Sequence, residues 1–540
     1  MHSCHSRYID RVRSFTRVNG ALFETSLAFL AHIHVKMDEV RRRKASVESK
    51  ESQESSWSSV GTNAQTNQTK RKFSFAQQRQ LEDKKGPCER QVHRAQDSLF
   101  SQSSGWTNFR GFFNLSILLL VISNGRVALE NVIKYGILIS PLQWISLLFK
   151  DISFWNWPNL ALLIASNVTI ITIFFSELII SYGWLGNRFA GVFYTFLIAT
   201  HLSVPAIFTL LAPAQNPIFA VAAMSIFVIE ALKMVSYVHV NYWARCAHEE
   251  MAQAKQKHKH LPGGEDGKCT ALHPDLKDEL SLYEMARLYP STLTLSNLYY
   301  FMLAPTLCYE LKFPRTHRIR KHFLLKRIVE VVFLGFLIAA LIQQWMVPTV
   351  HNSMGPLSEM EFTRCLERLL KLAVPNHVIW LIFFYSTFHS LLNLIAEVLR
   401  FADREFYRDF WNAETVSYFW KTWNIPVHRW ALRHIYMPMT RNNWSKSSAV
   451  FAVFFVSAFF HEYLVSVPLQ MFRIWALMGM LAQVPLSFVT DRIVKGGRAG
   501  NVVVWLSLIV GQPLAILMYV HDWYIIHHPQ LITENSIYEF

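Results

Sequence analysis

The residue pair best suited to chemistry in this sequence is His461 with Glu462, inside the run VFFVSAFFHEYLVSVPL. The rest of the run is largely apolar, and an ionisable pair is expensive to bury at membrane depth. One interpretation is structural, with His461 satisfied by a hydrogen bond across a helix bundle. The other is general base catalysis, because a desolvated imidazole stays neutral and can take a proton from an alcohol. His377, which follows Pro375, is a competing candidate.

A second segment that could carry chemistry precedes this run and interleaves aromatic residues with cations. It begins FYRDFWN (Phe406–Asn412) and continues AETVSYFWKTWNIPVHRW. An amphipathic helix at the membrane interface would explain most of this composition. It does not explain Pro426, which would interrupt such a helix. A break there would direct the polar group of Asn424 away from a regular helix face, and the segment is close enough in sequence to meet His461.

The elements that must position these residues are membrane-spanning helices. The sequence is 51% hydrophobic and 14% aromatic but only 17% charged. Its apolar residues cluster into about nine runs near the ~20 residues that a helix needs to cross a hydrocarbon core. The runs are Phe112–Leu129, Pro158–Tyr182, Ala190–Ala212, Pro217–Val240, Ile328–Val347, Leu372–Phe401, Ser448–Pro468, Met471–Val489 and Val502–Ile526.

The charges of the loops predict an orientation in the bilayer. If the basic N-terminal tail is cytoplasmic, alternation places the Lys- and Arg-rich loops on the cytoplasmic side, as the positive-inside rule requires. The opposite side receives Pro213–Asn216 and the C-terminal HHPQLITENSIYEF, which contain no Lys or Arg. The net charge of +15 therefore fits basic loops facing an anionic lipid surface. Nucleic acid is not expected as a partner.

Composition divides the chain into three parts. Residues 1–100 are basic and contain Ser- and Gln-rich sequence with few aliphatic residues, so we expect a disordered cytoplasmic tail. Residues 101–530 hold the apolar runs and form a membrane domain, in which residues 402–447 are a cytoplasmic segment. Residues 531–540 are expected to be a short lumenal tail.

Several kinds of reactive site have no pattern in this sequence. The six cysteines lack paired spacing and are interpreted as reduced thiols, not as a disulfide or zinc framework. No metal-ligand spacing is recognisable, so no metal is expected. There is no GxSxG elbow and no serine–histidine–acid motif, so a covalent acyl-enzyme is not required.

FYRDFWN resembles the FYxDWWN signature of the acyl-CoA branch of the membrane-bound O-acyltransferase family, which contains the sterol and the diacylglycerol acyltransferases. The similarity covers residues 92 to about 527. Phe410 stands where the signature has Trp, an exchange that keeps the packing volume but loses an indole N–H donor. Other stretches that resemble the diacylglycerol branch include LAPTLCYEL (Leu303–Leu311), FPRTHRIRK (Phe313–Lys321), QQWMVPT (Gln343–Thr349), WNIPVHRW (Trp423–Trp430) and SAFFHEYLVSVPL (Ser457–Leu469).

The resemblance implies roles for individual residues. His461 is implied as the catalytic histidine and Asn424 as its partner near the acceptor hydroxyl or thioester. Glu462, Gln483 and Gln512 are implied to line an internal reaction chamber, although helix–helix hydrogen bonding would explain the glutamines nearly as well. The implied acyl-CoA contacts are Trp420, Lys421, Thr422, Trp423, Asn424, Ile425, Pro426, Val427, His428, Tyr436, Lys446 and Tyr524. The implied signature residues are Phe406, Tyr407, Arg408, Asp409, Phe410, Trp411 and Asn412.

The resemblance also implies a fold and an activity. The fold is an all-α polytopic membrane protein of about nine transmembrane helices around the reaction chamber. The activity is transfer of a fatty-acyl group from acyl-CoA to diacylglycerol in the endoplasmic reticulum membrane, without a cofactor, by a homodimer or homotetramer. A sterol, retinol or wax alcohol is the alternative acceptor. A transporter with a proton relay through His461 and Glu462 is the alternative outside enzymes.

Overall fold

The structure is a computed structural model that describes residues 110–149, 158–211, 217–259, 284–354 and 362–527. The chain divides into two compact units, residues 1–113 and 114–540. Of the first unit only the start of one helix is described, so the account below concerns the second. The tails predicted at residues 1–100 and 531–540 lie outside the described residues.

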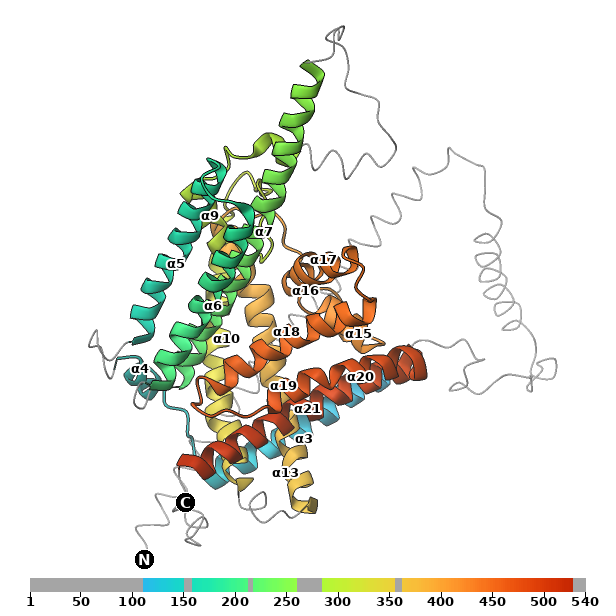
Figure 1. Cartoon of the computed structure of the whole chain (residues 1–540). Coiled ribbons are helices and arrows are strands. Elements are labelled where there is room, and N and C mark those ends of the chain that lie inside the picture. The colour runs from blue at the N-terminus through green and yellow to red at the C-terminus, as the bar shows by residue number, and fades with distance from the viewer. Residues whose placement is uncertain (1–109, 150–157, 212–216, 260–283, 355–361, 528–540) are drawn as a thin grey trace, which may run out of the picture. The chain divides into compact units, whose positions relative to one another are not determined.

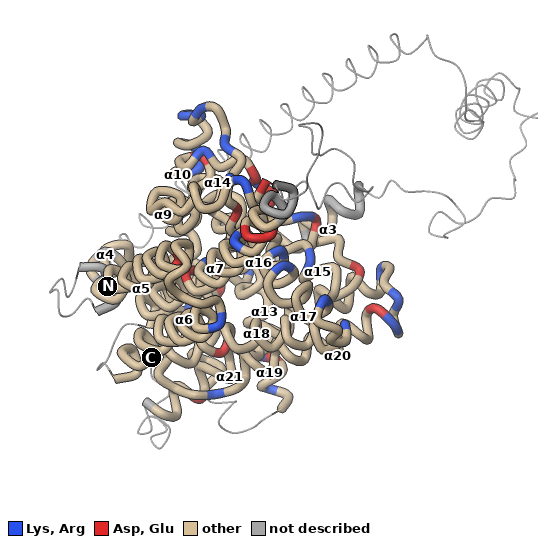
Figure 2. The backbone as a smooth tube through the Cα atoms, turned by 45° about the horizontal axis from the view of Figure 1, so that its top comes forward, with Lys and Arg blue, Asp and Glu red and all other residues tan. Residues whose placement is uncertain are grey.

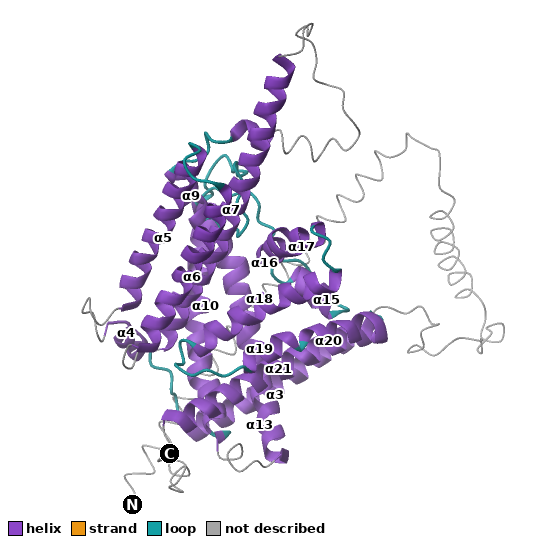
Figure 3. Ribbon diagram, viewed as in Figure 1, coloured by secondary structure: helices purple, strands orange, loops and turns teal. Residues whose placement is uncertain are grey.

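The described residues form helices joined by loops, and their only β contact is an isolated bridge between Arg315 and Phe401 (Figure 3). The long helices are α3 (Arg110–Tyr135), α5 (Pro158–Ser181), α6 (Asn187–Leu211), α7 (Pro217–Lys259), α10 (Lys321–Leu341), α13 (Phe362–Phe384), α18 (Lys446–Ser466) and α21 (Gly497–His527) (Figure 1). Shorter elements are α4 (Pro141–Phe149), α9 (Leu295–Leu303), η2 (Ile342–Met346), α11 (Val347–His351), η3 (Tyr385–Leu391), α14 (Leu392–Val398), η4 (Phe410–Asn412), α15 (Val416–Thr422), α16 (Ile425–Ala431), η5 (Leu432–Tyr436), α17 (Met437–Arg441), α19 (Trp475–Leu481), α20 (Gln483–Phe488) and η6 (Val489–Val494).

Seven described helical segments are long and apolar enough to cross a membrane. The all-α polytopic fold is therefore confirmed. Each of the nine predicted runs falls mainly on helical residues, but those on α3 and α10 are not among the seven. Lys326, Arg327 and Glu330 fall in the first half of α10 and reduce its apolar length. The seven segments are Ala161–Ser181, Asn187–Leu211, Pro217–Gln253, Phe362–Val398, Lys446–Ser466, Trp475–Val494 and Gly497–Ile526.

The outer faces of these helices are apolar. Large side chains such as Phe175, Phe196 and Phe333 are more than half exposed, at 54%, 68% and 63%. Contiguous apolar surface of this kind is unfavourable in water and matches the hydrocarbon of a bilayer. In Figure 2 most of the helical surface carries no charge, and Lys and Arg gather near helix ends, as beyond α20. The distribution agrees with a multi-pass membrane protein.

Helices α5, α6 and α7 pack against one another and are tied by buried ionic groups. Arg245 of α7 donates to Glu177 of α5 at 3.0 Å, and both side chains are buried. Lys233 of α7 is 4% exposed, and its Nζ donates to three carbonyl oxygens at the end of α9. These acceptors belong to Phe301, Met302 and Ala304, at 2.9, 2.8 and 2.7 Å. A helix end leaves such carbonyls unpaired, so Lys233 caps α9 from a neighbouring helix.

We expect Lys233→Met to destabilise the protein by about 2 kcal/mol or more, because buried carbonyls of α9 lose their donor. The measurement is thermal unfolding in detergent, followed by intrinsic fluorescence. Lys326→Met is the matched control, since the side chain of Lys326 is 65% exposed. Equal melting temperatures for the two variants would show that Lys233 does not stabilise α9.

Candidate active site

His461 lies about three-quarters of the way along α18, and its hydrogen bond fixes which nitrogen can act as a base. Nδ1 is 2.7 Å from the carbonyl oxygen of Ser457, one turn earlier in the same helix. A carbonyl oxygen only accepts, so Nδ1 carries the proton and donates it. In the neutral ring Nε2 then has the free lone pair. The backbone of α18 therefore leaves Nε2 available to accept a proton.

The surroundings of His461 differ from those of a histidine that only joins helices. Among the described residues it makes no hydrogen bond to another helix. The ring is surrounded by protein atoms and is nonetheless accessible to solvent. That combination is expected for a side chain that lines an internal cavity. The interpretation of His461 as a cross-bundle contact has no hydrogen bond to support it in the described part of the chain.

Asn424 lies at the break between two helices that was predicted from Pro426. Helix α15 ends at Thr422, and α16 begins at Ile425 with Pro426 in its first turn. Asn424 caps α16, because its Oδ1 accepts from the backbone N–H of Val427 at 3.2 Å. This bond uses the oxygen and leaves the amide NH2, which has no partner among the described residues. Asn424 can therefore donate a hydrogen bond to a ligand.

The signature segment holds this cap through its backbone. The N–H of Arg408 donates to the carbonyl of Thr422 at 2.8 Å, and the N–H of Ile425 donates to the carbonyl of Phe406 at 3.0 Å. These two bonds flank Asn424 on either side. The signature therefore fixes the position of Asn424 by main-chain pairing.

The side chains of the signature are also occupied by contacts. Phe410 is 3% exposed, and its ring centroid lies 4.6 Å from that of Phe384 on α13. The hydroxyl of Tyr407 lies 2.9 Å from Nδ1 of His389 on η3. Asp409 accepts from the hydroxyl of Tyr418 at 2.8 Å, which lowers the pKa of Asp409. The remaining contacts involve Arg408 with Glu405, Asn412 with Asp409, and the Trp411 carbonyl with Asn501 and Trp505.

Trp420 connects this segment to the helix that bears His461. Its ring packs edge-on against Phe454 of α18, with centroids 6.1 Å apart. Phe454 and His461 are seven residues apart, so they lie on nearly the same helix face about 10 Å apart along the axis. The indole N–H of Trp420 is buried and has no hydrogen-bond partner in the described residues. Trp420 therefore places an unpaired N–H donor against the face of α18 that carries His461.

Cationic residues surround α16 on the predicted cytoplasmic side. Lys421 is exposed and forms no ion pair with a described residue. Arg429 contacts Asp403 at 2.7 Å and Glu405 at 2.5 Å. Burial lowers the pKa of His428, and neighbouring cations, among them Lys421, lower it further. His428 is consequently neutral at neutral pH, and the exposed cation of Lys421 lies close enough to act on it.

The other predicted residues fall in different places. Gln512 of α21 accepts from Asn376 of α13 at 3.1 Å, so it does join two helices. Gln483 is half-buried at the start of α20. Lys446 is exposed at the start of α18, Tyr436 is half-buried at the end of η5, and Tyr524 is half-buried on α21. Thr422 and Ile425 are buried, Trp423 and Pro426 are half-buried, and Val427 is exposed.

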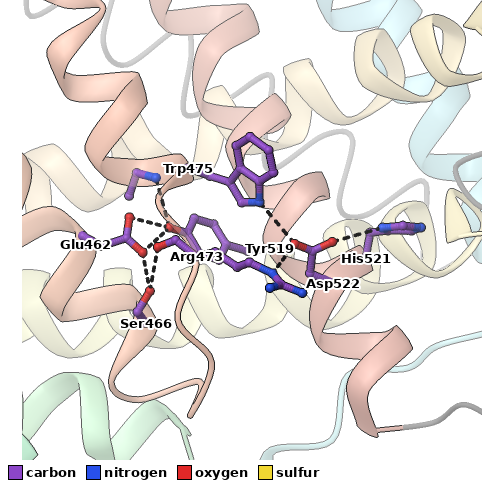
Figure 4. A network of polar contacts seen from close by, with 8 residues as sticks. Glu462, Ser466, Arg473, Trp475, Tyr519, His521 and Asp522 are labelled. Atoms are coloured by element: carbon purple, nitrogen blue, oxygen red, sulfur yellow. Dashed lines mark hydrogen bonds and ion pairs between the residues drawn. The ribbon is translucent and has the colours of Figure 1, made fainter.

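Glu462 does not pair with its neighbour His461. Its carboxylate accepts from the hydroxyls of Ser466 and Tyr519 (Figure 4) and from the backbone N–H of Leu477. Consecutive helix residues point about 100° apart, which separates the two side chains. Sequence reasoning identified Glu462 but not its partner Tyr519. The signal available for Tyr519 was its hydroxyl within an apolar span, which predicts a contact but not the acceptor.

No group of three or more potential metal ligands occurs among the residues that the structure describes.

The comparisons with known proteins all find O-acyltransferases. Residues 149–521 match the model of MBOAT, the membrane-bound O-acyltransferase family. The chain is 49% identical over 446 residues to diacylglycerol O-acyltransferase 1 of Bos taurus, covering 82% of this chain and 86% of that protein. It is 49% identical to the protein of that name from Homo sapiens over 443 residues, with the same coverage. Identity to that of Corylus americana is 36% over 430 residues, covering 79% and 73%.

The signature contacts predict unequal effects for two tyrosine substitutions. Tyr407→Phe removes the bond that joins the signature to η3 and leaves a partly buried imidazole nitrogen unpaired, at a cost of about 1–3 kcal/mol. Tyr418→Phe removes an exposed bond within the segment and should cost less. The measurement is the melting temperature of each variant in detergent. A larger loss for Tyr418→Phe would contradict the anchoring role of Tyr407.

Proposed function

The chain belongs to the membrane-bound O-acyltransferase family, and we propose that His461 is the base of its reaction. That reaction is transfer of a fatty-acyl group from acyl-CoA to the free hydroxyl of diacylglycerol, giving triacylglycerol. The observation that carries the assignment of the base is the tautomer of His461. Its Nδ1 donates to Ser457, so Nε2 is the atom that can accept the hydroxyl proton.

The proposed mechanism is a single acyl transfer. Nε2 of His461 removes the proton of the alcohol as its oxygen attacks the thioester carbonyl. The C–O bond forms, the C–S bond breaks, and the proton passes from the imidazolium to the CoA thiolate. The NH2 group of Asn424 donates to the carbonyl oxygen as negative charge develops there, which is worth about 3 kcal/mol for one well-placed donor.

The acyl-CoA site is proposed to be the residues implied by resemblance, Trp420–His428 with Tyr436, Lys446 and Tyr524. Three features support it. The exposed cation of Lys421 suits a CoA phosphate, the indole N–H of Trp420 has no described partner, and Trp420 packs on the same face of α18 as His461. The acyl chain would then enter the bundle beside α18. Gln483, Gln512 and Glu462 are proposed to border the same chamber.

We also propose the cellular setting. The protein is placed in the endoplasmic reticulum membrane with a cytoplasmic N-terminus and a lumenal C-terminus, and it assembles as a homodimer or homotetramer. Loop charge supports the orientation, and the family resemblance supports the compartment and the assembly. Diacylglycerol is preferred over a sterol acceptor because the matched relatives are named for it.

We expect His461→Ala to lower triacylglycerol formation by roughly 10²- to 10⁴-fold while the protein still folds, because the general base is lost. The assay uses purified protein with labelled acyl-CoA and diacylglycerol, and a parallel reaction with a sterol. His377→Ala is the control, since His377 packs between Trp380 and Trp505 and has no role in the mechanism. Wild-type turnover in His461→Ala would remove this imidazole from the reaction, and a sterol preference would change the acceptor.

The substitution Asn424→Asp tests the proposed catalytic role of Asn424 separately from its role as a helix cap. An aspartate oxygen still accepts from Val427, so we expect the melting temperature to change little. It has no N–H donor and adds negative charge beside the developing oxyanion, so turnover should fall by roughly 10²-fold or more. Thermal unfolding and turnover are measured on the same preparation. Turnover near the wild-type value would show that the amide NH2 does not act on the thioester.

A further inference from the structure

Tyr519 of α21 lies at the centre of the polar network in Figure 4. Its hydroxyl donates to the two carboxylate oxygens of Glu462 on α18, at 2.9 and 2.8 Å. The same hydroxyl accepts from the backbone N–H of Ala476 on α19, at 3.0 Å. The side chain of Tyr519 therefore links three helices, α18, α19 and its own helix α21.

These contacts cap the N-terminus of α19. Ile474 precedes the helix and provides no side-chain cap. The first free amides of α19 are instead bonded from other helices, Ala476 by Tyr519 and Leu477 by Glu462 at 3.0 Å. Since a helix start leaves several N–H groups unpaired, and lipid offers no replacement, this shared cap is a strong constraint on how α18, α19 and α21 meet.

A second contact fastens the same region three residues further along α21. Asp522 accepts from Nε of Arg473 at 2.8 Å and from Nε1 of Trp475 at 3.1 Å. Residues three apart lie on one face of a helix. Tyr519 and Asp522 therefore hold the turn between α18 and α19 from the same side, and the contacts of Asp522 do not involve the hydroxyl of Tyr519.

The constraint acts on His461 through the rotation of α18. His461 is bonded only to its own helix among the described residues, so its direction in the bundle follows the rotation of that helix. Glu462 is the next residue, and its carboxylate is held from α21 and α19. A rotation that moved the ring of His461 would pull Glu462 from these partners.

We propose that Tyr519 is a positioning residue for acyl transfer, which sets the direction of His461 by holding Glu462. The inference rests on the proposed function, in which His461 is the base. It assigns Tyr519 no contact with either substrate. Its loss should therefore slow the chemical step without weakening substrate binding.

The test is Tyr519→Phe in the full-length protein in detergent or nanodiscs. We expect kcat to fall by roughly 10- to 100-fold, the effect of a small displacement of a catalytic group. The KM values for acyl-CoA and diacylglycerol should remain near those of the wild type. Tyr299→Phe is the matched control, because it also removes a hydroxyl bond between helices, from Tyr299 to Asn167 at 2.9 Å. Its kcat should stay within about 2-fold of wild type, the range expected where no transition-state interaction is lost.

Glu462→Gln tests the same contact from the other side. A glutamine oxygen can still accept from Tyr519 and Leu477, so this variant should keep more activity than Glu462→Ala. In the double variant that combines Glu462→Gln with Tyr519→Phe, the losses in kcat should be less than multiplicative, because the two residues act as one unit. Multiplicative losses would overturn the coupling.

The outcomes separate this inference from the proposed function. A wild-type kcat in Tyr519→Phe, a raised KM as its main effect, or an equal loss in Tyr299→Phe overturns the positioning role. Failure of the proposed function appears elsewhere, as wild-type turnover in His461→Ala.

Discussion

The hydrocarbon core of a bilayer offers no water to a polar group, so each polar side chain within a span must find its partner inside the protein. Several ionisable side chains do so by joining helices. Glu177 pairs with Arg245, Lys233 caps α9, and Glu462 is bound by α19 and α21. His461 departs from this pattern. Its one hydrogen bond in the described residues stays within its own helix, which fixes the tautomer and leaves Nε2 unused.

The same reasoning explains what the signature segment does. Its density of aromatic and charged residues suggested direct chemistry, but the contacts point to a supporting role. Phe410 fills a buried aromatic cluster, Tyr407 joins η3, and Asp409 is bound by Tyr418. The backbone on both sides of Asn424 is paired with Phe406 and Arg408. The signature therefore holds Asn424 in place, and the two residues proposed for the chemistry, Asn424 and His461, lie outside it.

Sequence patterns predicted the helical class, the positions of the apolar runs and the break before Pro426, because each depends on local residue type. Two of the nine runs fall on helices outside the seven clear spans, and one of these helices, α10, begins with charged residues ahead of the predicted run. Two of the three partners of Glu462 could not be predicted. Ser466 lies one turn along the same helix, but Leu477 and Tyr519 are 15 and 57 positions away, and only the packing of α18 against α19 and α21 brings them to Glu462. Glu462 and His461 are adjacent in sequence, but their side chains diverge because consecutive residues on a helix point about 100° apart.

Under the role proposed for Asn424, asparagine at this position meets two demands on one side chain. A helix start favours Ser, Thr, Asp or Asn, because each offers an oxygen to an unpaired backbone N–H. A group that faces a developing oxyanion must in addition donate a hydrogen bond. Aspartate meets the first demand and opposes the second through its charge, while serine and threonine would use one short hydroxyl for both. Only asparagine has an oxygen and an NH2 group that point apart, so it can cap α16 through Val427 and still present a donor on its other side.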